Sequence, residues 1–160
     1  MTELMNFIIK QLKKENKSIT FIESCTGGGL ANALTNTPDS STVFKGSLVT
    51  YSTIDKIRMG VDEKIIKKHG IYSFEVATSM AKAAAENKEA DYSISVVGLL
   101  GAEDKDNPYH EANIAFICFY NRNTEKTKVL KMKLSNKERA ELKEDIILFV
   151  FENFKEFISL

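Results

Sequence analysis

Two potential nucleophiles, Ser24 and Cys25, lie side by side in the segment Glu23-Ser-Cys-Thr-Gly-Gly-Gly29. An apolar, β-branched run at 19–22 precedes this segment, and a helix-like run at 30–34 follows it. The pattern predicts a strand, a tight turn and a helix, with both nucleophiles on the turn. Such a turn directs backbone N–H groups and the positive end of a helix at one small volume. These groups together indicate either acyl transfer or phosphate binding.

A serine nucleophile at Ser24 needs a base, because its hydroxyl is essentially never ionised near neutral pH. The two histidines are poor candidates, since His69 is expected at a helix end and His110 in an exposed polar loop. A buried lysine can serve instead, because desolvation lowers its pKa. Lys56 lies about one helical turn beyond Tyr51, which ends a predicted strand, so both can reach the same end of the sheet as Ser24. Spacing alone does not distinguish Lys56 from the many surface lysines.

Cys25 is the rival nucleophile, because a helix N-terminus stabilises a thiolate. Adjacent residues on such a turn point in different directions, however, and free cysteines commonly pack inside proteins. We therefore expect Cys25 to be buried. The glycines at 27–29 lack the spacing of the phosphate-loop and dinucleotide fingerprints, and they can serve only to permit a tight turn.

An acidic cluster occupies the segment 103–111, where five side chains could hold a divalent ion: Glu103, Asp104, Asp106, His110 and Glu111. Their spacing matches no named metal motif. We interpret the cluster as a solvated loop and expect no metal site.

The composition indicates one domain over residues 1–160, with 43% hydrophobic residues to form a core. Lys+Arg and Asp+Glu both number 22, and this balance argues against a general nucleic-acid or membrane surface. The only cysteines, Cys25 and Cys118, have no metal-like spacing, which favours a reduced, cytoplasmic protein. Neither a signal peptide nor a membrane-spanning run is evident.

Hydrophobic periodicity and turn residues predict helices alternating with strands. The expected helices are 2–15, 26–35, 53–58, 62–69, 73–87 and 136–158, and the expected strands are 18–23, 43–51, 92–97, 112–120 and 127–134. Gly46 interrupts its strand and predicts a bulge or a close backbone approach. The order indicates an α/β fold with a mixed sheet, in which a hairpin over 112–134 supplies the antiparallel part.

A series of short motifs extends over nearly the whole chain in a characteristic order. Its members are Glu23-Ser-Cys-Thr-Gly-Gly28, Pro38-Asp-Ser-Ser41, Gly46, Val49-Thr-Tyr-Ser52, Lys56-Ile-Arg58, His69-Gly70, Ser73 with Glu75-Val76, and Asp91-Tyr92 through to Gly98. With these residues the chain resembles the CinA C-terminal domain family, which includes stand-alone nicotinamide mononucleotide (NMN) amidohydrolases. The resemblance implies a three-layer α/β/α sandwich and, by family analogy, a homo-oligomer.

The resemblance also implies an activity, the hydrolysis of NMN to nicotinic acid mononucleotide and ammonia without a cofactor. The family's nucleophilic serine falls on Ser24, and its assisting tyrosine and lysine fall on Tyr51 and Lys56. Lys56, relayed or positioned by Tyr51, would accept the Ser24 proton, while N–H groups of the turn stabilise the oxyanion. The residues expected to bind the substrate are Cys25, Thr26, Gly27, Gly28, Gly46, Arg58, Gly98 and Arg139.

The chain departs from the family where the nucleotide is expected to bind. Val97 replaces a threonine, and the acidic segment 103–106 replaces a glycine-rich loop and would repel a phosphate. Where the family has a Gly-Asp-Arg segment, this chain keeps the arginine as Arg139. Its planar guanidinium group suits a phosphate. Three interpretations follow, in this order: an NMN deamidase with a different phosphate clamp, an amidohydrolase for another amide, and a non-catalytic binding or scaffold protein.

Overall fold

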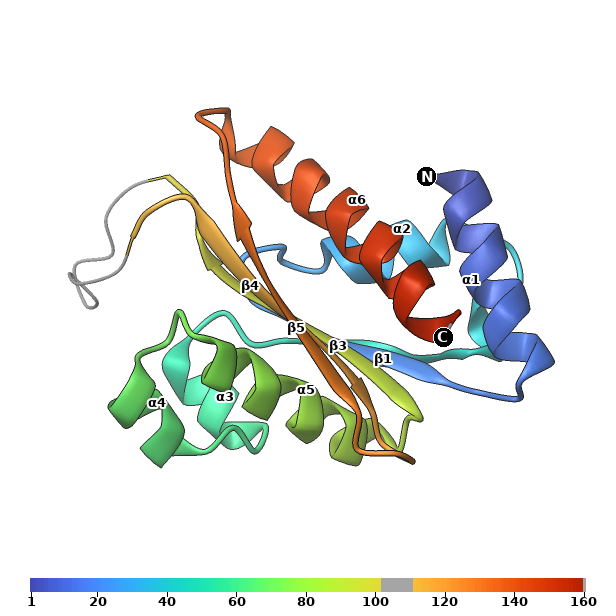
Figure 1. Cartoon of the computed structure of the whole chain (residues 1–160), viewed down its shortest axis with the longest axis horizontal. Coiled ribbons are helices and arrows are strands. Elements are labelled where there is room, and N and C mark those ends of the chain that lie inside the picture. Colours follow the sequence, from blue (N-terminus) through green and yellow to red (C-terminus); the bar gives the residue numbers. More distant parts are fainter. Residues whose placement is uncertain (102–110, 160) are drawn as a thin grey trace.

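The computed structural model describes residues 1–101 and 111–159 (Figure 1). The predicted acidic segment 103–106 and His110 lie outside these residues. The described elements in chain order are α1 (Thr2–Lys14), β1 (Ile19–Glu23), α2 (Gly29–Thr35), the 3-10 helix η1 (Ser40–Thr42), β2 (Phe44–Val49), α3 (Thr53–Arg58), α4 (Glu63–His69), α5 (Phe74–Lys88), β3 (Tyr92–Leu99), β4 (Ile114–Asn121), β5 (Thr127–Lys133) and α6 (Arg139–Ile158). Each predicted helix and strand is found, with shifts at several ends.

The five strands form one mixed sheet in the order β2-β1-β3-β4-β5. Strands β2, β1 and β3 are parallel, whereas β3 with β4 and β4 with β5 are antiparallel. The predicted hairpin is the β4–β5 pair. The parallel half therefore brings the carboxyl ends of β1, β2 and β3 to one edge of the sheet, where α/β proteins place ligands.

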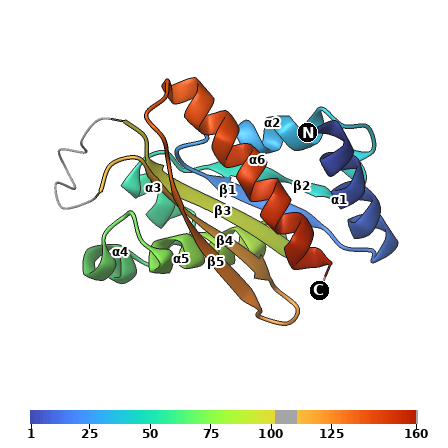
Figure 2. The same ribbon diagram turned by 45° about the horizontal axis from the view of Figure 1, so that its top comes forward.

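Helices cover both faces of the sheet, which confirms the predicted three-layer α/β/α arrangement. Figures 1 and 2 show α1, α2 and α6 on one face and α3, α4 and α5 on the other. Strand β1 is buried on both faces: Phe21 packs in the cluster with α1, α2 and α6, and Ile22 packs in the cluster with α5. This double burial explains why β1 is a continuous apolar run. No helix in the described part of the chain has the length and apolar character needed to cross a bilayer.

Two glycine-rich places depart from regular geometry. Helix α2 begins at Gly29 and not at Thr26, because Gly27 (φ +60°) and Gly28 (φ +94°) adopt left-handed conformations that close the turn first. Gly46 (φ +97°) lies where Ile19 pairs with residue 44 but Phe21 pairs with residue 47. Strand β2 thus carries one extra residue there, and the predicted bulge is confirmed.

Aromatic side chains of α6 fasten this helix to the sheet. Phe151 lies edge-on to Phe21 with ring centroids 5.8 Å apart, and Phe154 meets Phe119 at 5.5 Å. All four rings are fully buried. Such pairs add to the burial of apolar area, so α6 is held by its phenylalanine face.

We expect Phe154→Ala to lower the free energy of unfolding by about 3–5 kcal/mol, because it leaves a cavity among these rings. Urea denaturation monitored by circular dichroism measures the loss. Leu148→Ala on the same helix is the control, since Leu148 is 41% exposed and should cost under about 1 kcal/mol. Equal losses in the two variants would contradict this account of how α6 is held.

Candidate active site

A cavity of about 450 Å³ opens at the carboxyl ends of the parallel strands. Its lining residues are Ser24, Cys25, Tyr51, Ser52, Thr53, Lys56, Ile71, Tyr72, Gly98, Leu99 and Arg139. The main chain fixes its floor, because the Ser24 N–H donates to the Val96 carbonyl at 3.0 Å and the Thr50 N–H donates to the Glu23 carbonyl at 2.9 Å. Segments that follow β1, β2 and β3 therefore converge on one volume.

Lys56 and Ser24 meet in this cavity. The Lys56 Nζ lies 3.1 Å from the Ser24 Oγ and 2.7 Å from the Thr50 carbonyl oxygen, to which it donates. Lys56 is only 1% exposed. Ser52 sets its position, because the Ser52 side chain caps α3 by accepting the Asp55 N–H at 3.1 Å, and Lys56 follows in the first turn. The structure thus brings together two side chains that lie 32 positions apart in the sequence.

The electrostatics of the cavity suit Lys56 to act as a base. Burial lowers the pKa of Lys56 to about 8, while Cys25 and the Asp55 carboxylate act in the opposite direction. At pH 7 about a tenth of Lys56 side chains are then neutral, a far larger fraction than for a solvated lysine. A neutral amine 3.1 Å from the Ser24 hydroxyl can accept its proton.

Cys25 is buried, as predicted, and is 2% exposed. Burial raises the pKa of its thiol to about 12, although its own backbone N–H, Arg139, Lys56 and Lys143 act in the opposite direction. The thiol therefore stays protonated at neutral pH, and a protonated thiol is a poor nucleophile. This favours Ser24 over Cys25 as the attacking group.

The turn uses most of its own N–H groups. The Gly27 N–H donates to the Ser24 carbonyl at 3.1 Å, the Gly28 N–H donates to the Glu23 carboxylate at 3.1 Å, and the Gly29 N–H donates to the Thr26 carbonyl at 3.2 Å. Of the N–H groups of the turn that were expected to stabilise an oxyanion, two remain. These are the N–H groups of Cys25 and Thr26, which have no acceptor on another described residue.

Arg139 brings a cation to the cavity from the first position of α6. Its Nη1 donates to the Leu100 carbonyl at 2.7 Å, and its Nη2 donates to the Tyr51 hydroxyl at 3.1 Å. Tyr51 is 64% exposed, and its hydroxyl contacts neither Ser24 nor Lys56. The expected relay through Tyr51 is therefore not formed, and Tyr51 lies at the rim of the cavity beside Arg139.

Lys143 is a residue that the sequence reading missed. It lies one helical turn beyond Arg139, and its Nζ is 3.5 Å from the position that a Cβ on Gly27 would occupy. It forms no ion pair within the described part of the chain. The spacing of four residues from Arg139 on an expected helix was the signal that could have revealed it.

The other expected substrate-binding residues divide into three groups. Gly98 lines the cavity, and a Cβ there would lie 2.6 Å from the Ile114 carbonyl oxygen, so no larger residue fits. Thr26, Gly27 and Gly28 form the turn. Gly46 and Arg58 do not reach the cavity: Gly46 forms the bulge in β2, and the Arg58 side chain is 70% exposed beside Asp55.

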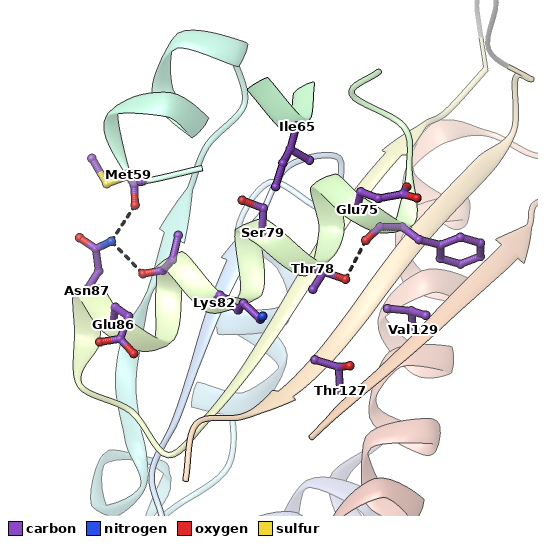
Figure 3. A pocket seen from close by; sticks show the side chains of 13 residues that line it. Met59, Ile65, Glu75, Thr78, Ser79, Lys82, Glu86, Asn87, Thr127 and Val129 are labelled. Carbon is purple, nitrogen blue, oxygen red and sulfur yellow. Dashed lines mark hydrogen bonds between the residues drawn. The ribbon is translucent and has the colours of Figure 1, made fainter. Parts of the chain in front are cut away.

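A larger cavity of about 680 Å³ lies elsewhere, between α5, the ends of α3 and α4, and strand β5. Figure 3 shows its labelled side chains, among them Glu75, Lys82 and Val129. None of the expected catalytic residues lines it. Within the described residues, no group of three or more His, Cys, Asp or Glu side chains is placed to hold a metal ion. The chemistry therefore concentrates in the smaller cavity.

Comparisons with known proteins agree over most of the chain. A model of the CinA C-terminal domain matches residues 1–158. A CinA-like protein of Prochlorococcus marinus subsp. pastoris is 37% identical over 142 residues, which are 87% of this chain and 32% of that protein. A putative competence-damage inducible protein of Streptococcus pneumoniae is 29% identical over 151 residues, or 94% of this chain and 35% of that protein. The chain spans about a third of the length of these relatives.

Solved structures share the fold. A competence/damage inducible protein from Agrobacterium tumefaciens superposes with a TM-score of 0.89 at 25% identity, covering 99% of this chain and 95% of that chain. A competence damage-inducible protein from Klebsiella pneumoniae gives a TM-score of 0.91 at 22% identity, covering 99% and 96%. The three-layer arrangement of the present chain is therefore one already seen in crystals.

We expect a fluorophosphonate probe to label Ser24 at a rate that depends on the protonation of Lys56. Because only neutral Lys56 accepts a proton, the rate should fall about tenfold for each pH unit below its pKa of about 8 and level off above it. Mass spectrometry of the labelled peptide measures the rate. Lys56→Arg should remove this rise of the labelling rate with pH, since arginine stays protonated. A flat profile between about pH 6 and 9 in the unmodified protein would refute the assignment.

Proposed function

This chain belongs to the CinA C-terminal domain family, and we propose that it is an amidohydrolase that converts NMN to nicotinic acid mononucleotide and ammonia. The observation that carries the proposal is the 3.1 Å contact between Ser24 and the buried Lys56. A serine beside a desolvated amine is an activated nucleophile, and acyl transfer is the reaction that such a pair performs. A cavity of about 450 Å³ is of a size that accepts a small molecule.

The first half of the proposed reaction forms an acyl-enzyme. Neutral Lys56 accepts the Ser24 proton as the Ser24 Oγ attacks the carboxamide carbon, and the carbonyl oxygen becomes an oxyanion. The N–H groups of Cys25 and Thr26, which no other described residue accepts, would support this charge. Lys56 then returns its proton to the amide nitrogen, the C–N bond breaks, and ammonia leaves a Ser24 ester.

The second half releases the acid. Lys56 is neutral again and takes a proton from a water molecule, while the oxygen of that water attacks the ester carbon. The C–O bond to Ser24 breaks, Lys56 gives its proton to the Ser24 oxygen, and the carboxylic acid departs as its carboxylate with release of a proton. On the protein, these proton transfers involve only Lys56 and Ser24.

Positive charge near the cavity and the Ser24 turn supports a phosphorylated substrate. Arg139 and Lys143 present two cations from successive turns of α6, and only the Arg139 guanidinium has hydrogen-bond acceptors among the described residues. A guanidinium fork with a nearby ammonium suits a phosphate. The acidic residues at 103–106 are the sequence feature that favours the alternative, an amide without a phosphate.

We expect ammonia release from NMN to exceed that from nicotinamide riboside and nicotinamide. Ser24→Ala should lower turnover at least about a thousandfold, because the nucleophile is gone, whereas the exposed Ser41→Ala should leave it unchanged. A coupled glutamate dehydrogenase assay measures the ammonia. Full turnover by Ser24→Ala would refute the mechanism. Equal rates with the riboside would favour an unphosphorylated amide, and no release from any of the three, with no labelling of Ser24, would favour a non-catalytic role.

We expect Lys143→Gln to raise the KM for NMN about tenfold with little change in kcat, because it removes a charge that meets the phosphate and not the reacting carbon. Steady-state kinetics with NMN and nicotinamide riboside measure this, and the KM for the riboside should not change. The control is Lys155→Gln, about 18 Å further along α6. An unchanged KM for NMN in Lys143→Gln would remove Lys143 from the proposed phosphate site.

A further inference from the structure

Glu23 is a buried carboxylate that the proposed chemistry does not use. Its side chain is fully buried, and no described lysine or arginine pairs with it. Its Oε2 accepts hydrogen bonds from the Thr26 hydroxyl at 2.7 Å, the Gly28 N–H at 3.1 Å and the Leu30 N–H at 3.0 Å. The carboxylate therefore lies beneath the turn that carries Ser24 and closes that turn against the start of α2.

The other oxygen of the same carboxylate reaches the neighbouring elements. Its Oε1 accepts from the Ala31 N–H at 3.1 Å and from the Ser47 hydroxyl at 3.1 Å. Five donors thus converge on one side chain, and they come from the turn, from α2 and from β2. Donors without a cation can hold a buried carboxylate when each hydrogen bond is made.

The main chain of Glu23 supports the partner of Ser24. Its carbonyl accepts the Thr50 N–H at 2.9 Å, and the Thr50 carbonyl in turn accepts from the Lys56 Nζ at 2.7 Å. One residue therefore anchors the turn of the nucleophile through its side chain and the acceptor of the base through its backbone.

We propose that Glu23 is the positioning residue of the Ser24–Lys56 pair, with its carboxylate holding the nucleophile turn at the distance from Lys56 that proton transfer requires. The inference rests on the proposed function where turnover is used to measure it. Labelling of Ser24 provides a second readout. A displacement of about 1 Å in a reacting group can lower a rate about a hundredfold, so small movements of the turn are costly.

The role requires a carboxylate and not an amide. An ionised carboxylate only accepts hydrogen bonds, and all five contacts of Glu23 come from donors. In Glu23→Gln, one oxygen becomes an NH2 group that faces either the Gly28 and Leu30 N–H groups or the Ala31 N–H, whereas the Thr26 and Ser47 hydroxyls can rotate to accept from it. The turn or the start of α2 must then shift to separate the NH2 group from the backbone N–H groups.

The same carboxylate also decides where a substrate phosphate can bind. Glu23 takes the N–H groups of Gly28, Leu30 and Ala31, which an anion would otherwise use. A phosphate placed there would meet a negative charge. The phosphate end of a substrate is therefore directed away from the start of α2 and toward the cations of α6.

The test compares Glu23→Gln with Ser47→Ala, because each alters the hydrogen bonds of the Glu23 side chain, but Ser47 lies on β2 and not on the turn. For Glu23→Gln we expect kcat with NMN and the rate of Ser24 labelling by a fluorophosphonate each to fall about a hundredfold, with KM within about threefold of the unmodified protein. Ser47→Ala should keep both rates within about threefold. Thermal unfolding checks that each variant is folded.

Thr26→Val is the second variant and decides the test if Glu23→Gln does not fold. It removes the 2.7 Å contact from the turn and leaves the carboxylate in place, so kcat and labelling should fall about tenfold with KM retained. Folded variants with full kcat and labelling would overturn the positioning role, as would equal losses in Ser47→Ala. If the unmodified protein is labelled at Ser24 but releases no ammonia from NMN, the proposed function fails, while the labelling rates still decide the role of Glu23.

Discussion

The burial of one ammonium group, that of Lys56, is the constraint on which the site depends. A lysine removed from water loses hydration, and Lys56 recovers only part of it from the Thr50 carbonyl and the Ser24 hydroxyl. No carboxylate within the described residues forms an ion pair with it. The ammonium form is therefore disfavoured, and the pKa falls to about 8. A carboxylate partner would stabilise the ammonium and would reduce the neutral fraction of Lys56 that the proposed chemistry needs.

The topology of the sheet provides this burial. Parallel strands β1, β2 and β3 end together, so the residues that follow them share one volume. Ser24 follows β1 directly, Thr50 follows β2, and the short helix α3 returns Lys56 over the Thr50 carbonyl. Gly98 lines the cavity and permits the close approach of β3 to β4, since a side chain at 98 would collide with the β4 backbone.

Local sequence predicted the elements well because their patterns are local. The apolar run at 19–22 becomes a strand buried on both faces, and the glycine at 46 becomes a bulge. The start of α2 was wrong by three residues, because the pattern at 26–28 fits a helix until the left-handed angles of Gly27 and Gly28 are known. Helix propensity does not predict the φ angles of these two glycines, since glycine also occurs in helices.

The site was less predictable because its contacts are long-range. The direction of Tyr51 is set by Arg139, 88 positions away, so a reading of the segment around Tyr51 could not place its hydroxyl. The convergence of five donors on Glu23 depends on α2 and β2 lying side by side with the turn. The spacing of Lys56 from Tyr51 offered it only weakly as the base, and the family resemblance then pointed to the same lysine. Burial and the position of its Nζ distinguish it from the surface lysines, and both are properties of the folded chain.

The distribution of charge around the turn separates the chemistry from the choice of substrate. The negative charge of Glu23 lies beneath the turn, where it saturates the first N–H groups of α2, whereas the positive charges of Arg139 and Lys143 lie on α6. In the proposed reaction, a substrate with a neutral amide at one end and an anion at the other would be oriented by this arrangement with the amide toward Ser24. The turn and Lys56 would contact only the reacting group, so the proposed mechanism applies equally to many amides. Selection between a phosphorylated and an unphosphorylated amide would then fall to the α6 cations, which can change without disturbing the hydrogen bond between Lys56 and Ser24.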